Sequence, residues 1–305
     1  MTDRMSLRFL FSSTTPAAPF GTAVTQVAPV GAALALAAIL AAAAPAVAGP
    51  GDTLRGFAAH RAVYEMTLAR RNDRADVLEV SGRLVYEFSG NTCDGFSSRF
   101  RLVTRLTNND GRARVTDMRT TSFEDGAGKS FDFVNQNLVD GRTIEDTKGI
   151  ARHDGAATRV TLAGGDGKPI DLPAEVRFPT EHMVDLLEAA KAGRSLAEID
   201  LFDGSDGGRK VFRTTVVIGR EQSGADDTAG EPAADAALTE GKRRWPVEIS
   251  YFDRSKPQGD VLPDYQLGFL LYENGVSRQL RLDYGDFAIG GRLSSLEALP
   301  AGECK

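Results

Sequence analysis

The sequence predicts a mainly β protein, with one large antiparallel sheet that curls or closes and one packed amphipathic helix. Two observations lead to this prediction. Apolar residues recur with a period of two along most of the chain, as in strands with one buried face. Pairs such as Asn274-Gly275 separate these runs, and they tolerate the positive φ that tight hairpins need. The expected strands outnumber those of a usual flat sheet, so the sheet should curve.

The first strands show the alternation most clearly. In the run that begins at Val80, Leu84 and Phe88 share one face, whereas Arg83 and Glu87 share the other. The same pattern predicts further strands along most of the remaining chain. They are expected near residues 59–70, 96–106, 112–123, 130–136, 142–151, 157–162, 198–203, 210–218, 245–253, 266–273, 276–284 and 287–296.

One segment breaks the period of two. In residues 181–193 the apolar side chains follow the i, i+3, i+4, i+7 spacing of an amphipathic helix, at Met183, Leu186, Leu187 and Ala190. Thr180 can cap the start of this helix, and Gly193 can end it. The simplest role for a single helix in a strand-rich chain is to cover the sheet. A lid or a partner-binding helix is the alternative.

The first 48 residues have the features of an export signal. Arg4 and Arg8 supply positive charge, and residues 27–47 are almost entirely small or apolar. Small residues that end at Ala48 match a signal peptidase site, so we expect cleavage after Ala48. A membrane-spanning helix is the alternative, but two prolines interrupt this Ala-rich stretch. The rest of the chain is therefore expected in an oxidising compartment.

Residues 49–305 are predicted to form a single domain that is soluble after signal removal. No second apolar run approaches the length that spans a membrane. Residues 221–241 lack alternation and hold almost no large apolar side chain before Leu238. Such a composition cannot bury enough surface to offset the entropy of ordering. We therefore expect 221–241 to be a mobile insertion loop, with a linker between two domains as the alternative.

Little in the composition points to catalysis. The net charge of −6 argues against binding to nucleic acid. The three histidines, His60, His153 and His182, lie in no metal-binding motif. Neither a phosphate-binding loop nor a nucleophile elbow is present. The sequence therefore predicts no catalytic residue, no metal site, no cofactor and no enzymatic activity.

Cys93 and Cys304 are the only cysteines. A redox-active pair usually lies in a CxxC motif or beside a histidine that lowers a thiol pKa. Neither arrangement occurs here. In an oxidising compartment we expect a structural disulfide that joins an early hairpin to the end of the chain.

Several motifs occur in an order that resembles a known family across residues 55–304. They are the run 80–88 with Cys93-Asp94-Gly95-Phe96, the helix entry 178–182, and the segments 201–205, 271–276 and 283–287. Together they look like the alphaproteobacterial domain-of-unknown-function family that contains the cell envelope integrity protein EipB. The resemblance implies a periplasmic β-spiral with a packed helix, a Cys93–Cys304 disulfide and an association with envelope integrity under stress. It implies no established enzymatic activity.

The function hypothesis is a non-enzymatic periplasmic protein that supports envelope integrity by binding. Its partner would be another periplasmic protein or an envelope component, and the sequence does not identify it. The alternative is a carrier of a lipid or lipopeptide, an apolar ligand held in a cavity of the curved sheet. An envelope hydrolase is the third hypothesis, and it requires catalytic groups that only folding would bring together.

Overall fold

The fold is described by a computed structural model of the 305-residue chain. It covers residues 50–164, 168–224, 231, 236–256, 262–302 and 304. In this part of the chain, fourteen strands form one antiparallel sheet, and the helices are few. The prediction of a mainly β fold is confirmed. The predicted signal peptide 1–48 and its cleavage site lie outside the described residues.

The chain consists mainly of consecutive strands, with a few helices between them. The strands are β1 His60–Arg71, β2 Glu79–Asn91, β3 Gly95–Thr107, β4 Ala113–Glu124, β5 Ser130–Val139, β6 Arg142–His153, β7 Thr158–Leu162, β8 Ile170–Leu172, β9 Leu196–Leu201, β10 Phe212–Ile218, β11 Arg244–Asp253, β12 Tyr265–Tyr272, β13 Ser277–Asp283 and β14 Phe287–Ala298. The described helices are α1 Pro50–Arg55, α2 Pro179–Lys191, α3 Ser205–Gly208 and α4 Ala236–Thr239. None of these helices is long and apolar enough to cross a membrane.

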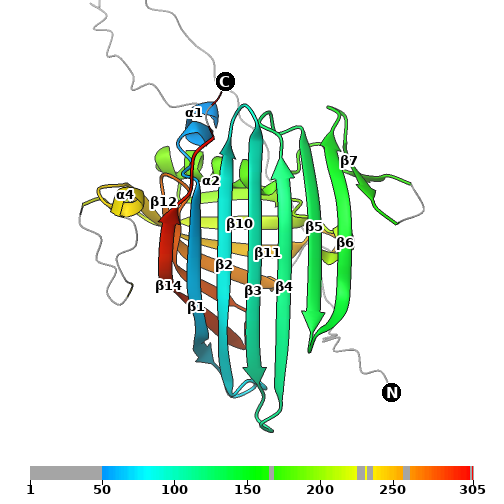
Figure 1. Cartoon of the computed structure of the whole chain (residues 1–305), viewed down its shortest axis with the longest axis vertical. Coiled ribbons are helices and arrows are strands. Elements are labelled where there is room, and N and C mark those ends of the chain that lie inside the picture. Colours follow the sequence, from blue (N-terminus) through cyan, green and yellow to red (C-terminus); the bar gives the residue numbers. More distant parts are fainter. Residues whose placement is uncertain are drawn as a thin grey trace, which may run out of the picture. The chain divides into compact units, whose positions relative to one another are not determined.

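Two meanders make up the sheet. The N-terminal meander consists of β1 to β8 and the C-terminal meander of β9 to β14, each in sequence order. They join where β1 pairs with β14, from His60 opposite Ala298 to Arg71 opposite Phe287. Figure 1 shows this pair as the blue and red strands that lie side by side. The first and last strands of the described chain therefore meet in the middle of the sheet.

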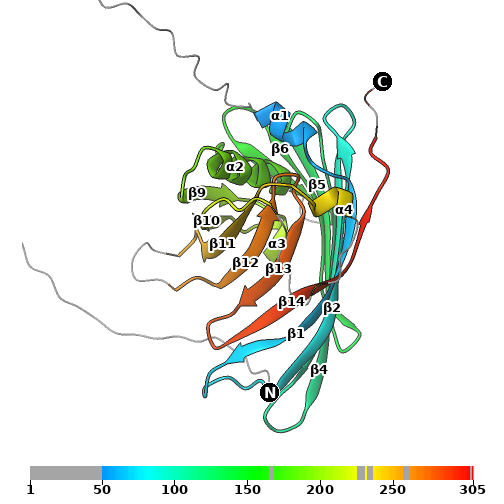
Figure 2. The ribbon, with the colours of Figure 1, turned by 90° about the vertical axis from the view of Figure 1, so that its left-hand side faces the viewer.

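The sheet curls without closing. In the described residues its two end strands, β8 and β9, do not pair with each other. The segment before α2 partly bridges them, because Arg177 forms a parallel bridge with Leu201 at the edge of β9. Its N–H donates to the Asp200 carbonyl at 2.7 Å, and its carbonyl accepts from the Phe202 N–H at 2.9 Å. Figure 2 shows the two meanders facing each other, with α2 near one end of the space between them.

Helix α2 is the amphipathic helix that the sequence predicts, and its apolar face is buried. Leu186, Leu187 and Ala190 pack among side chains of β9 to β12, and Met183 packs against the same cluster while partly exposed. The predicted cap is wrong. The residue that precedes the helix is Phe178, because the Pro179 ring has the φ of a first helical position and lacks an N–H to satisfy. The Thr180 side chain instead contacts β4.

The segment 221–241 contacts the sheet at several of its described residues. Gln222 forms an antiparallel bridge with Arg244, and Leu238 is buried. Glu231 forms an ion pair with Arg278 at 2.8 Å, with both side chains at most 5% exposed. Residues 225–230 and 232–235 lie outside the described residues, so the mobility of this insertion stays a prediction.

A candidate ligand-binding cavity

A cavity of about 620 Å³ lies on the concave side of the curled sheet. Its volume falls within the range of about 300–1,000 Å³ that is usual for small-molecule sites. Both meanders and α2 contribute to its wall, so it exists only because the sheet curls over itself. Most of its lining is aliphatic or aromatic.

The N-terminal meander supplies most of its part of the wall through alternate residues of three neighbouring strands. They are Leu84, Tyr86 and Phe88 on β2, Ser98, Phe100 and Leu102 on β3, and Met118, Thr120, Ser122 and Glu124 on β4. The pairing register aligns them in rows, with Leu84, Leu102 and Met118 in one and Tyr86, Phe100 and Thr120 in the next. Glu124 lies six residue steps along the extended strand from Met118, which corresponds to about 20 Å. The cavity is therefore elongated along the strands.

Polarity changes along this wall. The β4 residues run from Met118 through Thr120 and Ser122 to Glu124. Met118 is 42% exposed and Glu124 only 4%. Tyr284, which lines the opposite wall, is also 42% exposed. The cavity thus has an apolar rim at Met118 and Tyr284 and a buried polar floor at Glu124.

The opposite wall comes from the C-terminal meander. Its residues are Tyr265, Leu267 and Phe269 on β12 and Ser277, Leu280 and Leu282 on β13, with Tyr284 just beyond. The N-terminal end of α2 completes the floor through Pro179, Thr180 and Met183. The described lining contains no lysine and no arginine.

Glu124 is the most unusual residue of the floor. The Thr180 N–H donates to its Oε1 at 2.9 Å and to its Oε2 at 3.0 Å, and the Thr180 hydroxyl donates to Oε1 at 2.7 Å. The carboxylate therefore caps the positive end of α2 from another element. Burial raises the pKa of Glu124 to about 7, against the opposing effect of these hydrogen bonds. In the described residues no cation pairs with it at salt-bridge distance.

A second carboxyl group, that of the partly exposed Asp203, lines the same cavity. It follows β9, and its Oδ1 accepts a hydrogen bond from the Ser205 N–H at 2.9 Å. Burial raises its pKa as well. No hydrogen bond joins Asp203 to Glu124 in the described residues. Each acid thus has separate hydrogen-bond donors, Thr180 for Glu124 and Ser205 for Asp203.

The other titratable groups of the lining are neutral near pH 7. Burial lowers the pKa of His60, although its Nδ1 lies 2.8 Å from the Ala58 carbonyl. Burial also raises the pKa of Tyr86, Tyr265 and Tyr284 above the ordinary phenol value. The charge of the cavity is therefore set by its two carboxyl groups.

The remaining histidines make protein contacts away from the cavity lining. Nδ1 of His153 lies 2.7 Å from the Thr158 hydroxyl, and Nε2 of His182 lies 2.9 Å from the Thr214 hydroxyl. Among the described residues, no cluster of His, Cys, Asp or Glu is suited to a metal ion.

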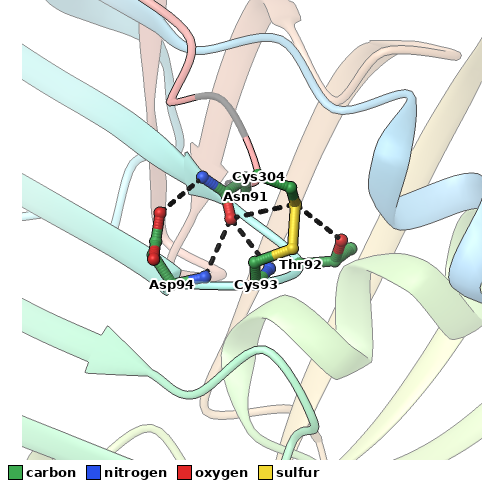
Figure 3. The surroundings of a disulfide bond; sticks show 5 residues. All are labelled: Asn91, Thr92, Cys93, Asp94 and Cys304. Atoms are coloured by element: carbon green, nitrogen blue, oxygen red, sulfur yellow. Dashed lines mark hydrogen bonds between the residues drawn. A yellow bond between two sulfur atoms is a disulfide. The ribbon is translucent and has the colours of Figure 1, made fainter.

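Cys93 and Cys304 form a disulfide with a Cα–Cα distance of 5.6 Å. Cys93 lies in the turn between β2 and β3, where the Asn91 Oδ1 accepts hydrogen bonds from the N–H groups of Cys93 and Asp94, both at 2.8 Å. Figure 3 shows how these side chains gather around the sulfur atoms. Beyond β14, the Leu299 N–H donates to the Ala59 carbonyl as the chain passes β1. The bond therefore fastens the tail across β1 to the β2–β3 hairpin, outside the cavity lining.

The sequence prediction missed both acids of the cavity. The expected strand ended at residue 123, one position before Glu124. Continuing the alternation of Met118, Thr120 and Ser122 by one step would have placed an acid on the inner face. Asp203 has no such signal, because it lies in a turn after β9 and reaches the cavity only through tertiary packing.

Comparisons with known proteins agree with this architecture. The chain is 39% identical over 249 residues to the cell envelope integrity protein EipB of Brucella abortus (strain 2308), covering 81% of this chain and 86% of that protein. A crystal structure of a β-barrel-like protein of a domain of unknown function from Brucella abortus matches with a TM-score of 0.72 and 37% identity. That match covers 80% of this chain and 99% of that one. The EipB-like family model matches residues 52–300, and the chain belongs to the EipB-like family.

Proposed function

We propose that this protein supports cell envelope integrity without catalysing a reaction, by holding a lipid or lipopeptide in its cavity. One observation carries the proposal: an elongated cavity of about 620 Å³ with a mostly apolar lining on the concave face of the sheet. A sheet whose only task was structural would gain stability by filling this space, because unfilled apolar volume is destabilising. The name of the Brucella relative supports the role in the envelope.

The proposed location is the periplasm, after cleavage of the signal peptide behind Ala48. The disulfide supports an oxidising compartment. Fractionation of cells and the intact mass of the exported protein test this point. A mature chain that begins at Gly49 and carries two oxidised cysteines is the expected result, and a full-length chain in the cytoplasm would contradict it.

Two neighbouring threonines on β4 allow a matched test of ligand binding. Thr120 lines the cavity, whereas Thr121 faces outward and is exposed. We expect Thr120→Trp to fill the cavity and Thr121→Trp to leave it open. Lipid extraction and mass spectrometry of the exported proteins should find bound lipid in the wild type and in Thr121→Trp, but not in Thr120→Trp.

The same variants connect the cavity to the cell. In a strain that lacks the gene, Thr121→Trp should restore resistance to envelope stress and Thr120→Trp should not. Full complementation by a folded Thr120→Trp protein, together with a wild type free of lipid, would refute the carrier function. Crosslinking in living cells would then identify the protein or envelope component that it binds instead.

A hydrolase is the second candidate, favoured by the raised pKa values of two acids in one cavity, Glu124 and Asp203. Their hydrogen bonds give them structural roles, as a helix cap and a turn partner. Release of soluble fragments from purified envelope material by the wild type, but not by Asp203→Asn, would establish hydrolysis and displace the proposal above.

A further inference from the structure

We infer that the ligand of the cavity is an amphiphile whose polar end is an uncharged or cationic hydrogen-bond donor, seated against Glu124. This inference rests on the proposed function and adds the chemistry of the polar end. It follows from the placement of charge in the wall, from the hydrogen bonds of Glu124 and from the gradient of polarity along β4.

The charge of the lining disfavours an anionic polar end when the two acids are ionised. Glu124 and Asp203 are the acids of the described lining, and no lysine or arginine accompanies them. A phosphate or a fatty carboxylate at the floor would face like charge in a medium of low polarity, without a counterion to offset its desolvation. An ammonium group or a hydroxyl group meets no such penalty.

Glu124 has acceptor capacity left for such a donor. A carboxylate offers about four lone-pair positions. Thr180 donates to it through its N–H and its hydroxyl, and the Glu181 N–H is a further donor. Of the Thr180 contacts, Oε2 receives the longer branch of the shared N–H hydrogen bond, at 3.0 Å. A ligand donor at Oε2 would add a charge-assisted hydrogen bond to the Glu124 carboxylate. The negative charge of this carboxylate is otherwise stabilised only by the N-terminal end of α2.

The neighbouring polar groups of the floor do not compete for this position. The hydroxyl groups of Ser98 and Ser122 are 2.7 Å apart and satisfy each other. Toward the rim the wall changes to Leu102, Leu84 and Met118, which suits an aliphatic chain. The polar end is thus expected at the floor and the chain toward the rim.

Three amphiphiles with the same chain test the inference: dodecylamine, dodecanol and dodecanoate, each below its aggregation concentration at neutral pH. Their affinities are measured by displacement of N-phenyl-1-naphthylamine, a neutral fluorescent probe for apolar sites, from the mature protein. We expect dodecylamine to bind most tightly and dodecanoate least. The ratio of their dissociation constants should be at least about tenfold, which is what one charge-assisted hydrogen bond provides.

Glu124→Gln keeps the size of the side chain and its capping oxygen, and should reduce this ratio to nearly one. The matched control is Glu181→Gln at the same end of α2. Glu181 accepts the Phe178 N–H but does not line the cavity, so this variant should keep most of the ratio. If Glu124→Gln does not fold, the three affinities measured with the wild-type protein decide whether the inference holds.

The outcomes separate the two proposals. Equal affinities for all three amphiphiles, or tightest binding of dodecanoate, would overturn the inference and leave the cavity function intact. An amine preference that persists in folded Glu124→Gln would overturn the role of Glu124. Failure of all three compounds to displace a bound probe would overturn the cavity function and this inference together.

Discussion

The two faces of strands β2 to β4 differ in how they treat charge. On the convex face the charges are paired: Arg83 with Glu65 on β1 at 2.8 Å, and Asp117 with Arg101 on β3 at 2.9 Å and with Arg119 on its own strand at 2.6 Å. On the concave face Glu124 has a helix end in place of a cation. The same alternation therefore produces an exposed face, where ionised side chains cost little free energy, and a buried face, where a single ionised side chain costs much more. A costly buried group needs an explanation, which the proposed ligand provides.

The largest expected difference between the faces concerns packing. Phe131 on β5 is fully buried and stacks on Phe133 and Phe178, with ring centroids 5.4 and 5.3 Å away. Phe131→Ala should lower the free energy of unfolding by about 3–5 kcal/mol. Val134 lies on the opposite face of the same strand, so Val134→Ala should cost less than about 1 kcal/mol. Urea denaturation measures both, and equal losses would mean that the faces are not distinct in packing.

The disulfide should hold the curl that creates the concave face. Cys304→Ser removes the link between the tail and the β2–β3 hairpin, and should cost about 2–5 kcal/mol of stability. Because the tail follows β14, hydrogen exchange should accelerate first in β14 and β1. Cys93→Ser breaks the same bond, so it should cause the same loss of stability and the same exchange pattern as Cys304→Ser. Uniform acceleration across the sheet would show that the bond acts on the whole fold instead.

The pH dependence of stability should have opposite signs for the two faces. The pKa of Glu124 is about 7 in the folded state, above the ordinary glutamate value of 4.5, so the folded state binds more protons between these two pH values. Its contribution therefore makes stability fall as pH rises from about 4.5 to 7, by up to about 3 kcal/mol. Hydrogen bonds from Arg101 and Arg119 lower the pKa of Asp117, so its stabilising contribution is lost when pH falls below its unfolded value.

Glu124→Gln isolates the inner contribution. The difference in unfolding free energy between the wild type and this variant, measured from pH 4.5 to 7.5, should change with pH in the direction given above. A difference that stays constant over this range would show that the Glu124 pKa is not raised.

The smallest expected effect lies on the convex face. Arg101 is partly exposed, and Asp117 keeps Arg119 when Arg101 is removed. Arg101→Ala should therefore cost less than about 1 kcal/mol, and added salt should reduce the effect. A loss comparable to that of Phe131→Ala would contradict the view that charge on this face is weakly coupled to stability.

Local patterns predicted the strands, the helix and the turn, because each depends on near neighbours in the sequence. The alternation around Leu84, the stripe at Leu186 and Leu187, and the Asn274-Gly275 turn between β12 and β13 are all found in the structure. Strand β8, with three residues, is too short to show a period. The cavity could not be predicted, since its walls come from meanders that meet only after folding. The role of Thr180 was missed for the same reason, because its acceptor, Glu124, lies on another element.

The central pairing of β1 with β14 also bears on incomplete chains. A product that ends before β14 would lack the partner of β1 and would leave that edge open in the middle of the sheet. It would also lack Cys304, so Cys93 would carry a free thiol. An open strand edge is a template for aggregation, and an exposed thiol is open to oxidation. Strand β14 and Cys304 therefore protect two reactive features of the folded protein, the edge of β1 and the thiol of Cys93.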